Sequence, residues 1–305
     1  MRALVRYDLA MSETTTHQPA VLAEVPSEGT FLTFDLAHVG AAAHVLEAVK
    51  RLDARDDMVL GLGEPLVRGA GLAVEGLRGF PALAGPSVGV PSTQGALFVF
   101  LSGGDGGERV HRARELVAAL GEVRVVEDVP AFSYAGGRDL SGYEDGTENP
   151  EERAADVALV AEGPGKGGSF VAVQRWVHTL SVLEAMSPAA RDHVIGRSRD
   201  TNEELSDAPE SAHVKRSAQE SFTPEAFMLR RSMPYGSTKE HGLVFVAYGA
   251  SLDAYERVMR RMAGLDDGIR DAIFSYSRPV TGGYYFCPPV RHRRYDLAAL
   301  VASGG

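Results

Sequence analysis

One order of elements occurs twice along this chain, and this duplication restricts the possible folds more than any single motif does. Two apolar segments, Gly95–Leu101 and Gly242–Tyr248, begin with glycine and are typical of buried strands. Each is followed by a helical pattern that contains Glu-Arg-Val, at Glu108–Val110 in the first half and at Glu256–Val258 in the second. The period is one whole domain, which argues against a solenoid of short repeats.

Each half orders its elements as a ferredoxin-like domain does. Apolar runs predict strands, and apolar residues at helical spacing predict helices. In the first half the predicted elements are Gly29–Asp35, Val39–Leu52, Met58–Gly63, Gly95–Leu101, Glu108–Leu120 and Val123–Val129. The second half repeats the order with a strand at Gly168–Trp176, a helix at Pro188–Ile195 and the strand at Gly242–Tyr248, but it carries a long polar insertion at Arg197–Glu225. We therefore predict an α+β fold of tandem duplicated ferredoxin-like domains, with antiparallel sheets and helices.

Three segments follow from this order. We expect a disordered, polar leader at residues 1–26, an N-terminal ferredoxin-like domain at residues 27–140 and a C-terminal one at residues 141–305. Met11 resembles a natural start, so the sequence does not say whether residues 1–10 are native.

Charge and cysteine content narrow the class of protein. The 305 residues include 31 basic and 41 acidic ones, a net charge of −10, which argues against nucleic acid or an anionic membrane as the main partner. No apolar run reaches the roughly 18 residues that a membrane span needs. The single cysteine, Cys287, rules out an internal disulfide and suits a reducing cytoplasm.

The segment that joins the halves, Gly142–Pro150, has the sequence GYEDGTENP and the character of a turn. Gly142 and Gly146 flank an acidic centre, and glycine lets a backbone approach a ligand closely. Two interpretations are open at this point: an acidic, solvated connection, or a loop that places Asp145 for chemistry. A third, that Glu144, Asp145 and Glu148 bind a divalent cation, is weaker because acidic glycine-rich turns are common.

Several familiar active-site motifs are missing. The chain has no HExxH motif, no paired Cys/His set, no GxGxxG after a strand, no phosphate-binding Walker loop and no GxSxG. These absences leave little basis for a zinc site, a nucleotide site or an esterase triad. Taken alone, His213 in the polar insertion would be a surface residue.

Several stretches together resemble the dye-decolourising peroxidases, in particular the compact bacterial B-type subgroup. The motif Gly142-x-x-Asp145-Gly146 matches the signature of that family. His213 and Arg230 fall at the spacings at which the family has its haem ligand and its distal arginine. Further agreement, in the same order, comes from Val173–His178, Ile195–Arg197, Arg230–Gly236 and Pro279–Phe286. The resemblance extends from about Gly29 to Pro288, and the family has the tandem ferredoxin-like fold as well.

The resemblance implies a haem peroxidase that binds one haem b per chain, mainly in the second domain. His213 would be the proximal iron ligand. Asp145 would accept the proton of hydrogen peroxide and help deliver it to the leaving oxygen, since a carboxylate is ionised at mildly acidic pH. Arg230, which does not deprotonate, would supply a fixed positive charge to the O–O bond as it breaks.

Other haem contacts are implied less directly. His178 would touch a propionate or fill the core, because it alternates with Trp176 along one strand face. For Trp176, core packing is the better explanation, although an electron relay is the alternative. Arg197 and Arg216 would neutralise haem propionates or belong to a solvated face. The full set of predicted cofactor-binding residues is His213, Asp145, Gly146, Thr147, His178, Arg197, Arg216, Arg230 and Phe245.

Two departures from the family pattern leave questions open. Ser232 stands where some members have asparagine, and Ser275 and Ser277 occupy a stretch in which members often have a carboxylate. The sequence therefore does not identify the hydrogen-bond partner of His213, and it does not weigh Asp145 against Arg230.

The sequence thus predicts a cytoplasmic, self-associating haem peroxidase that uses hydrogen peroxide and small aromatic reductants. One alternative is a haem-handling protein, for iron release or storage, with weak peroxidase activity. Another is a ferredoxin-like binding module without enzymatic activity. The physiological reductant and the oligomeric state do not follow from the sequence.

Overall fold

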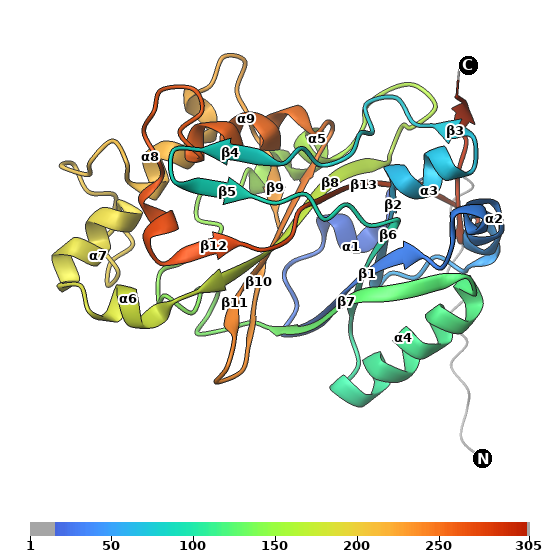
Figure 1. Cartoon of the computed structure of the whole chain (residues 1–305), viewed down its shortest axis with the longest axis horizontal. Coiled ribbons are helices and arrows are strands. Elements are labelled where there is room, and N and C mark those ends of the chain that lie inside the picture. The colour runs from blue at the N-terminus through green and yellow to red at the C-terminus, as the bar shows by residue number, and fades with distance from the viewer. Residues whose placement is uncertain (1–15, 304–305) are drawn as a thin grey trace.

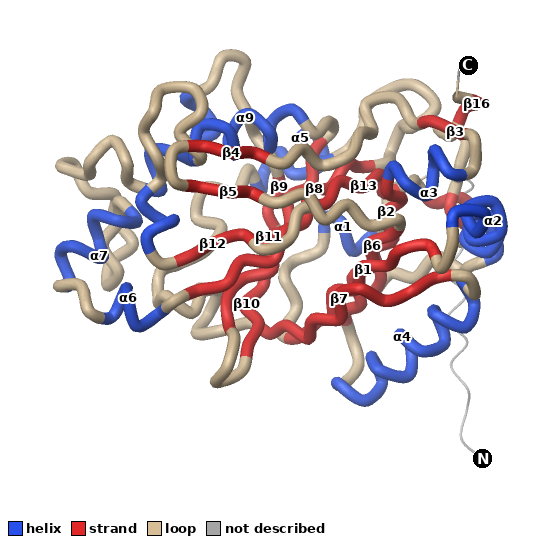
Figure 2. The backbone as a smooth tube through the Cα atoms, in the orientation of Figure 1, coloured by secondary structure: helices blue, strands red, loops and turns tan. Residues whose placement is uncertain are grey.

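The computed structural model describes residues 16–303, so the expected start at Met11 lies outside the described residues. Two units of four main strands each make up the sheet (Figures 1 and 2). The first unit has the strand order β7-β1-β6-β2 and the second has the order β13-β8-β11-β10, which is the same permutation of their sequence order. The predicted tandem ferredoxin-like α+β fold is confirmed, and the boundary at residues 140 and 141 stays a prediction.

The elements of the first unit lie close to their predicted positions. Its strands are β1 (Glu28–Leu36), β2 (Met58–Gly63), β3 (Leu72–Ala73), β4 (Leu83–Gly85), β5 (Val88–Val90), β6 (Leu97–Ser102) and β7 (Val123–Phe132). Its helices are α1 (Pro19–Leu22), η1 (Val39–Ala41), α2 (Ala42–Arg51), α3 (Glu64–Gly69) and α4 (Gly106–Leu120).

The second unit follows a short connection. Its strands are β8 (Ser169–His178), β9 (Leu229–Arg230), β10 (Met233–Gly236), β11 (His241–Gly249), β12 (Ser277–Pro279), β13 (Gly283–Cys287), β14 (Val290–Arg291), β15 (Arg294–Tyr295) and β16 (Val301–Ala302). Its helices are η2 (Glu151–Arg153), α5 (Ala154–Ala158), α6 (Leu180–Glu184), α7 (Pro188–Ile195), α8 (His213–Ser217), η3 (Gln219–Ser221), α9 (Asp253–Met262) and η4 (Ala272–Ser275). The polar insertion is thus not a structureless loop, since it contains α8 and η3.

The two units are joined by strand pairing at both edges. Phe286 of β13 pairs with Leu62 of β2, and Tyr235 of β10 pairs with Ala131 of β7. Because β8 pairs with both β13 and β11, the sheet closes on itself. The two faces of each strand therefore meet different surroundings, one inside the closed sheet and one under the helices.

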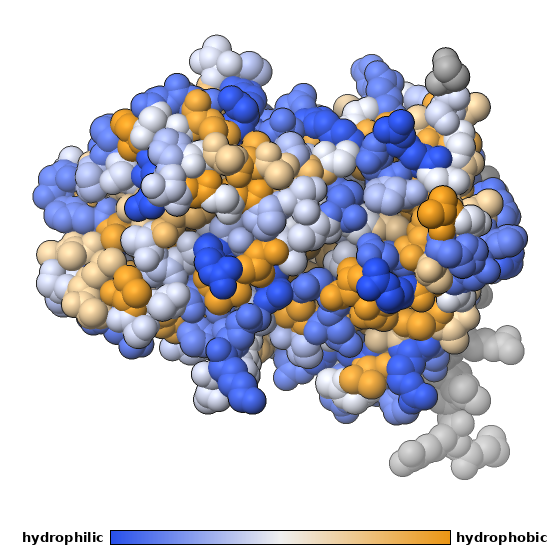
Figure 3. All heavy atoms as spheres, in the orientation of Figure 1, coloured by the Kyte–Doolittle hydropathy of each residue, from blue (hydrophilic) through white to orange (hydrophobic). Residues whose placement is uncertain are grey.

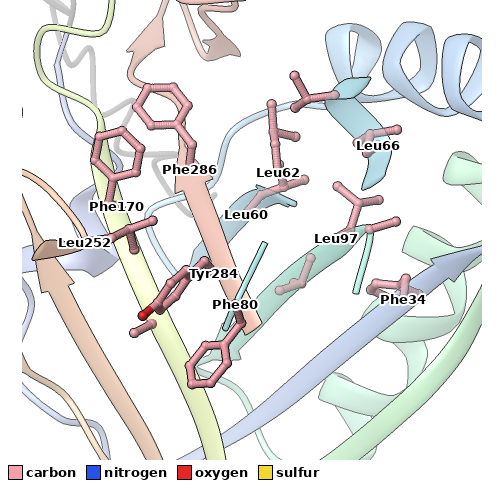
Figure 4. Packing of buried hydrophobic residues seen from close by; sticks show 14 of the residues in the cluster. Phe34, Leu60, Leu62, Leu66, Phe80, Leu97, Phe170, Leu252, Tyr284 and Phe286 are labelled. Atoms are coloured by element: carbon pink, nitrogen blue, oxygen red, sulfur yellow. The ribbon is translucent and has the colours of Figure 1, made fainter. Parts of the chain in front are cut away.

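Residue alternation along the strands assigns these two faces. In β6, Leu97, Val99 and Leu101 pack under the helices, whereas Phe98 and Phe100 pack inside the closed sheet. Figure 4 shows the first of these layers where the units meet, with Phe286 of β13 beside Leu62 of β2. In β8 and β11 the helix-facing residues include Trp176 and Phe245, so these side chains point toward α9 rather than into the closed sheet.

The helices differ from prediction in the faces that they bury. Val110 and Leu120 both belong to the apolar pattern that predicts the helix Glu108–Leu120, but Val110 is 59% exposed, whereas Leu120 is buried together with Leu116. Val39 was expected to belong to the first helix, but it lies in the short turn η1 and is 93% exposed. The duplicated Glu-Arg-Val tripeptide therefore does not occupy equivalent faces, since Val258 of α9 is buried.

The segment that precedes β1 is ordered from residue 16 onward, whereas a disordered leader was expected up to residue 26. Pro19–Leu22 forms a helical turn whose Ala20 and Val21 are buried against the sheet. Gln18, 2% exposed, accepts a hydrogen bond from the Leu60 N–H at 2.7 Å and donates to the carbonyls of Leu60 and Pro288. The segment thereby connects strands of both units.

The surface is mixed in character. On the face seen in Figure 3, hydrophobic residues lie in small groups among hydrophilic ones. Within residues 16–303, no helix is both long enough and apolar enough to span a bilayer.

Candidate active site

A cavity lies between the helix-facing side of the second unit's sheet and the helices α8 and α9. Its lining is mostly apolar, and every lining residue belongs to the second unit or to the connection before it. The hydrophobic residues on this wall are Trp176, Ile195, Met228, Leu243, Phe245, Val258, Met259, Met262 and Ile273. Polar and charged side chains also line it, including those of Asp145, His213 and Arg230, and apolar walls with converging polar groups are typical of a small-molecule site.

His213 is the first residue of α8 and faces the cavity. Its Nδ1 lies 2.8 Å from Oδ2 of Asp271, whose side chain has no exposed surface, while 26% of the His213 side chain is exposed. Because an ionised carboxylate only accepts hydrogen bonds, Nδ1 carries the proton and the lone pair of Nε2 is left for a ligand. Burial lowers the pKa of His213, but the charge of Asp271 and its hydrogen bond outweigh burial and raise the pKa.

Asp271 is held by the elements around it. Its Oδ1 accepts the Ile273 N–H at 2.9 Å, and its own N–H donates to the carbonyl of Met262 at the end of α9. The next residue, Ala272, donates to the carbonyl of Ser211, just before α8. These bonds fix the carboxylate and the imidazole relative to each other and to both helices.

Asp145 enters the cavity from the glycine-rich connection. Gly142 and Gly146 have φ angles of +89° and +78°, the left-handed region that favours glycine. The Asp145 N–H donates to the carbonyl of Gly137 at 3.0 Å, so the turn doubles back on the connecting segment. Asp145 is only partly buried, and the surface that it exposes belongs to the cavity wall.

Arg230 lies on the two-residue strand β9 and also lines the cavity. Its Nε is buried and has no hydrogen-bond partner among the described residues. Burial raises the pKa of the Asp145 carboxyl, while the positive charge of Arg230 opposes that rise and the negative charge of Asp139 adds to it. The acid and the arginine are therefore close enough to interact, although within residues 16–303 no carboxylate forms an ion pair with the partly buried Arg230.

A second polar group lines one end of the cavity. His178 Nδ1 lies 2.7 Å from the hydroxyl of Ser277, and His178 Nε2 lies 3.1 Å from Oδ1 of Asp139. Burial would raise the pKa of Asp139, but hydrogen bonds from His178 and Ser141 outweigh burial and lower it. Asp139 and His178 thus form a buried ion pair or hydrogen-bonded pair that also influences Asp145.

The structure brings together part of the predicted site. His213, Asp145, Arg230, His178 and Phe245 all line the cavity. The other four predicted haem-binding residues do not line the cavity that the described residues form. They are Gly146, Thr147, Arg197 and Arg216. A haem contact by any of the nine residues stays a prediction.

The residues outside the lining have partners of their own. Arg197 forms an ion pair with Glu148, and it donates to the carbonyl of Asn202 at 2.9 Å. Arg216 is 4% exposed and donates through both terminal nitrogens to Asp267 at 2.8 Å. Each of these contacts stabilises the polar insertion against its surroundings.

Sequence reasoning missed three residues at the site. Asp271, Asp139 and Gln219 all line the cavity or contact a lining residue, and all are buried. Asp271 belongs to no recognised motif, and it precedes the stretch with Ser275 and Ser277 in which family members often have a carboxylate. Ser232, in contrast, lies between β9 and β10, where it is buried and accepts the Val246 N–H at 3.3 Å, outside the cavity lining.

Comparison with known proteins identifies the family of the chain. Residues 136–292, just over half of the chain, match the family model for the C-terminal part of Dyp-type peroxidases. The chain belongs to the dye-decolourising peroxidase family.

Relatives in that family resemble the chain over much of its length. A dye-decolourising peroxidase of Mycolicibacterium paratuberculosis is 33% identical over 224 residues, which cover 70% of this chain but only 63% of that protein. The dye-decolourising protein from Vibrio cholerae aligns with a TM-score of 0.80 and 27% identity, covering 93% of this chain and 99% of that one. A variant of Rhodococcus jostii DypB in complex with haem aligns with a TM-score of 0.80 and 29% identity, covering 88% and 96% of the two chains.

Proposed function

We propose that this chain is a haem peroxidase that reduces hydrogen peroxide with electrons from small aromatic donors such as phenols and dyes. The observation that carries the proposal is the cavity that holds His213, backed by Asp271, together with Asp145 and Arg230. Membership of the peroxidase family and the haem complex of a structural relative support it.

The residues present fit haem better than a bare metal ion. Among the described residues no group of three His, Cys, Asp or Glu side chains could hold a metal, so the cavity offers one imidazole nitrogen as its protein ligand. A porphyrin supplies the four in-plane nitrogens itself, and its flat apolar surface suits the apolar walls. His213 would bind the iron, and Phe245 and Leu243 would pack against the ring.

Asp145 and Arg230 have different roles in the reaction with peroxide. Haem, when bound, supplies an iron centre that can accept peroxide as a ligand and exchange electrons with it. Asp145 accepts a proton from one peroxide oxygen and delivers it to the other, which leaves as water. Arg230 stabilises the negative charge that develops on the leaving oxygen, and the apolar walls strengthen this effect by excluding water.

The imidazole side of the cavity has a separate role. Asp271 accepts the Nδ1 proton of His213, which makes the imidazole a stronger electron donor through Nε2. Two one-electron transfers from reducing substrates would then return the protein to its resting state.

The test is a stopped-flow absorbance experiment on haem-loaded protein mixed with hydrogen peroxide. We expect a fast spectral change in the wild type, slowed about 10²- to 10⁴-fold in Asp145→Asn and in Arg230→Ala, the range of a single general acid–base or electrostatic contribution. Asp200→Asn is the matched control, because it makes the same change at an exposed aspartate outside the cavity lining.

Other outcomes would redirect the proposal. Tight haem binding with a Soret band that barely responds to peroxide would favour haem handling, such as iron release or storage. The absence of any Soret band after expression with haem would favour a binding module without haem. We also propose a cytoplasmic location, consistent with the lone thiol of Cys287, and self-association, which sedimentation velocity would test.

A further inference from the structure

Arg230 is held along its backbone by a side chain from the loop that carries Asp145. On one edge of β9, Arg230 pairs with Ala247 of β11. On the other, the Arg230 N–H donates to Oδ1 of Asn149 at 2.9 Å, and Nδ2 of Asn149 donates to the Arg230 carbonyl at 3.0 Å. The amide of Asn149 therefore occupies the place of a neighbouring strand on this edge.

Asn149 is tightly connected to Asp145. Its N–H donates to the carbonyl of Gly146 at 2.9 Å, closing a turn that begins directly after Asp145. Gly146 has a φ of +78°, and a Cβ there would lie 3.1 Å from Nδ2 of Asn149, so the turn leaves little space around the amide. The loop and β9 are thus fixed to each other at one residue on each side.

Gln219 forms a second connection between the same segments. It is 2% exposed, donates to the carbonyl of Glu148 at 3.2 Å and accepts the Met228 N–H at 2.7 Å. Residues 148 and 149 of the loop are therefore tied to residues 228 and 230 of the strand by two side-chain amides.

The side chain of Arg230 depends on this backbone anchor. Its Nε is buried and finds no acceptor among the described residues. A guanidinium that no acceptor holds at Nε takes its position from the backbone and from packing. A displacement of about 1 Å at a catalytic group can cost on the order of 100-fold in rate.

We propose that Asn149 is a positioning residue that sets the register between Arg230 and Asp145 for the reaction with peroxide. This role rests on the function proposed above. Asn149 acts through the backbone of Arg230, and it lies outside the cavity lining. The amide matches both an N–H and a carbonyl, which serine or aspartate at this position would match only in part.

Two variants separate positioning from general stability. Asn149→Ala removes both hydrogen bonds. Asn149→Asp retains the acceptor but loses the donor while ionised, and its protonated carboxyl restores both, since the O–H can donate to the Arg230 carbonyl. Asn202→Gly is the matched control, because Asn202 binds the outer side of the same loop through Glu144 and Thr147 and has a φ of +58° that glycine tolerates.

The first measurement uses haem-free protein. Hydrogen–deuterium exchange of the Arg230 amide should accelerate in Asn149→Ala and remain slow in Asn202→Gly. This readout tests the anchor independently of haem and of activity. An unchanged exchange rate of the Arg230 amide in Asn149→Ala would overturn the proposal, because Asn149 would then not hold the Arg230 backbone.

The second measurement uses haem-loaded protein. We expect the rate with peroxide and the affinity for cyanide to fall about 10- to 100-fold in Asn149→Ala, with haem affinity unchanged. In Asn149→Asp the rate relative to wild type should recover as the pH falls, whereas in Asn149→Ala it should not. Faster exchange with an unchanged peroxide rate and cyanide affinity would show a merely structural role and overturn the proposal. If the wild type itself did not react with peroxide, the proposed function would fail, and cyanide affinity together with the exchange data would still decide the role of Asn149.

Discussion

Nδ1 of His213 lies 2.8 Å from Oδ2 of Asp271, although the two residues are 58 positions apart in sequence. The contact joins the start of α8 to the turn that follows α9, and the carboxylate is completely buried. It supplies the partner that the sequence did not identify for His213. The electron-donating strength of the imidazole therefore depends on a residue outside the recognised motifs.

Asp271→Asn should weaken haem binding about 10- to 100-fold, the usual cost of losing a partner of a metal ligand. It should also raise the iron reduction potential, because an uncharged amide leaves the imidazole a poorer electron donor. Haem transfer to apomyoglobin and spectroelectrochemistry measure these two effects. Asp266→Asn is the control, since Asp266 is exposed and forms a surface ion pair with Arg260. An unchanged iron reduction potential in Asp271→Asn would show that Asp271 does not control the electron-donating strength of His213.

The sequence predicts features that depend on local residue patterns better than features that depend on tertiary contacts. The strand at β2 and the helix at α7 lie where their patterns predicted them, because hydrophobic period and a proline at the helix start act locally. Asp145, His213 and Arg230 were found by spacing within a family motif, and the structure places all three at one cavity. Hydrophobic period, a proline at the helix start and motif spacing can all be recognised without knowledge of the tertiary fold.

Other features needed the fold itself. Asp271 meets His213 only because the turn after α9 folds back on α8, and no pattern in its neighbours shows that. Val110 and Val258 share the tripeptide Glu-Arg-Val, yet one is exposed and the other buried, because α4 and α9 turn different faces to their sheets. A repeat in sequence thus marks a common ancestor element without fixing which face is covered.

Asp145→Asn should stabilise the haem-free protein at neutral pH. The pKa of Asp145 is raised mainly by burial, against the opposing charges of Arg230 and His213 and with the support of Asp139. The folded state therefore holds the proton to a higher pH than the unfolded chain, in which an aspartate titrates near ~3.9. The contribution of Asp145 to the folding stability is therefore fully present below its unfolded-state pKa. This contribution is lost as the pH rises through the folded-state pKa, because the carboxyl then has to ionise inside the protein.

Thermal unfolding of wild type and variant between acidic and neutral pH checks this sign. The two melting temperatures should converge at the acidic end and diverge toward neutral pH, with the variant higher. Asp200→Asn, at an exposed aspartate, should follow the wild-type curve. Parallel curves for wild type and Asp145→Asn would contradict a raised pKa.

Gly196→Ala should destabilise the protein more than Gly71→Ala. Both glycines have left-handed backbones, with φ of +94° and +74°, which cost an alanine roughly 1–2 kcal/mol. At Gly71 a Cβ would meet nothing within 4 Å, whereas at Gly196 it would overlap Cγ1 of Val214, the neighbour of His213. Overpacking adds about 1–3 kcal/mol there, and it should also weaken haem binding. Urea unfolding compares the pair, and equal losses would show that the Val214 contact relaxes freely.

Arg216→Lys tests whether Arg216 holds a haem propionate or only the fold. The guanidinium donates through both terminal nitrogens to Asp267 at 2.8 Å and to the Arg261 carbonyl at 2.8 Å, and it lies outside the cavity lining. Lysine retains the charge but loses the bidentate geometry, so we expect a loss of about 1–3 kcal/mol in the unfolding free energy. A structural role predicts the same loss in the haem-free and the haem-loaded protein, measured by urea unfolding of each. A clearly larger loss in the haem-loaded protein would instead support a propionate contact, because only that form would lose an additional partner.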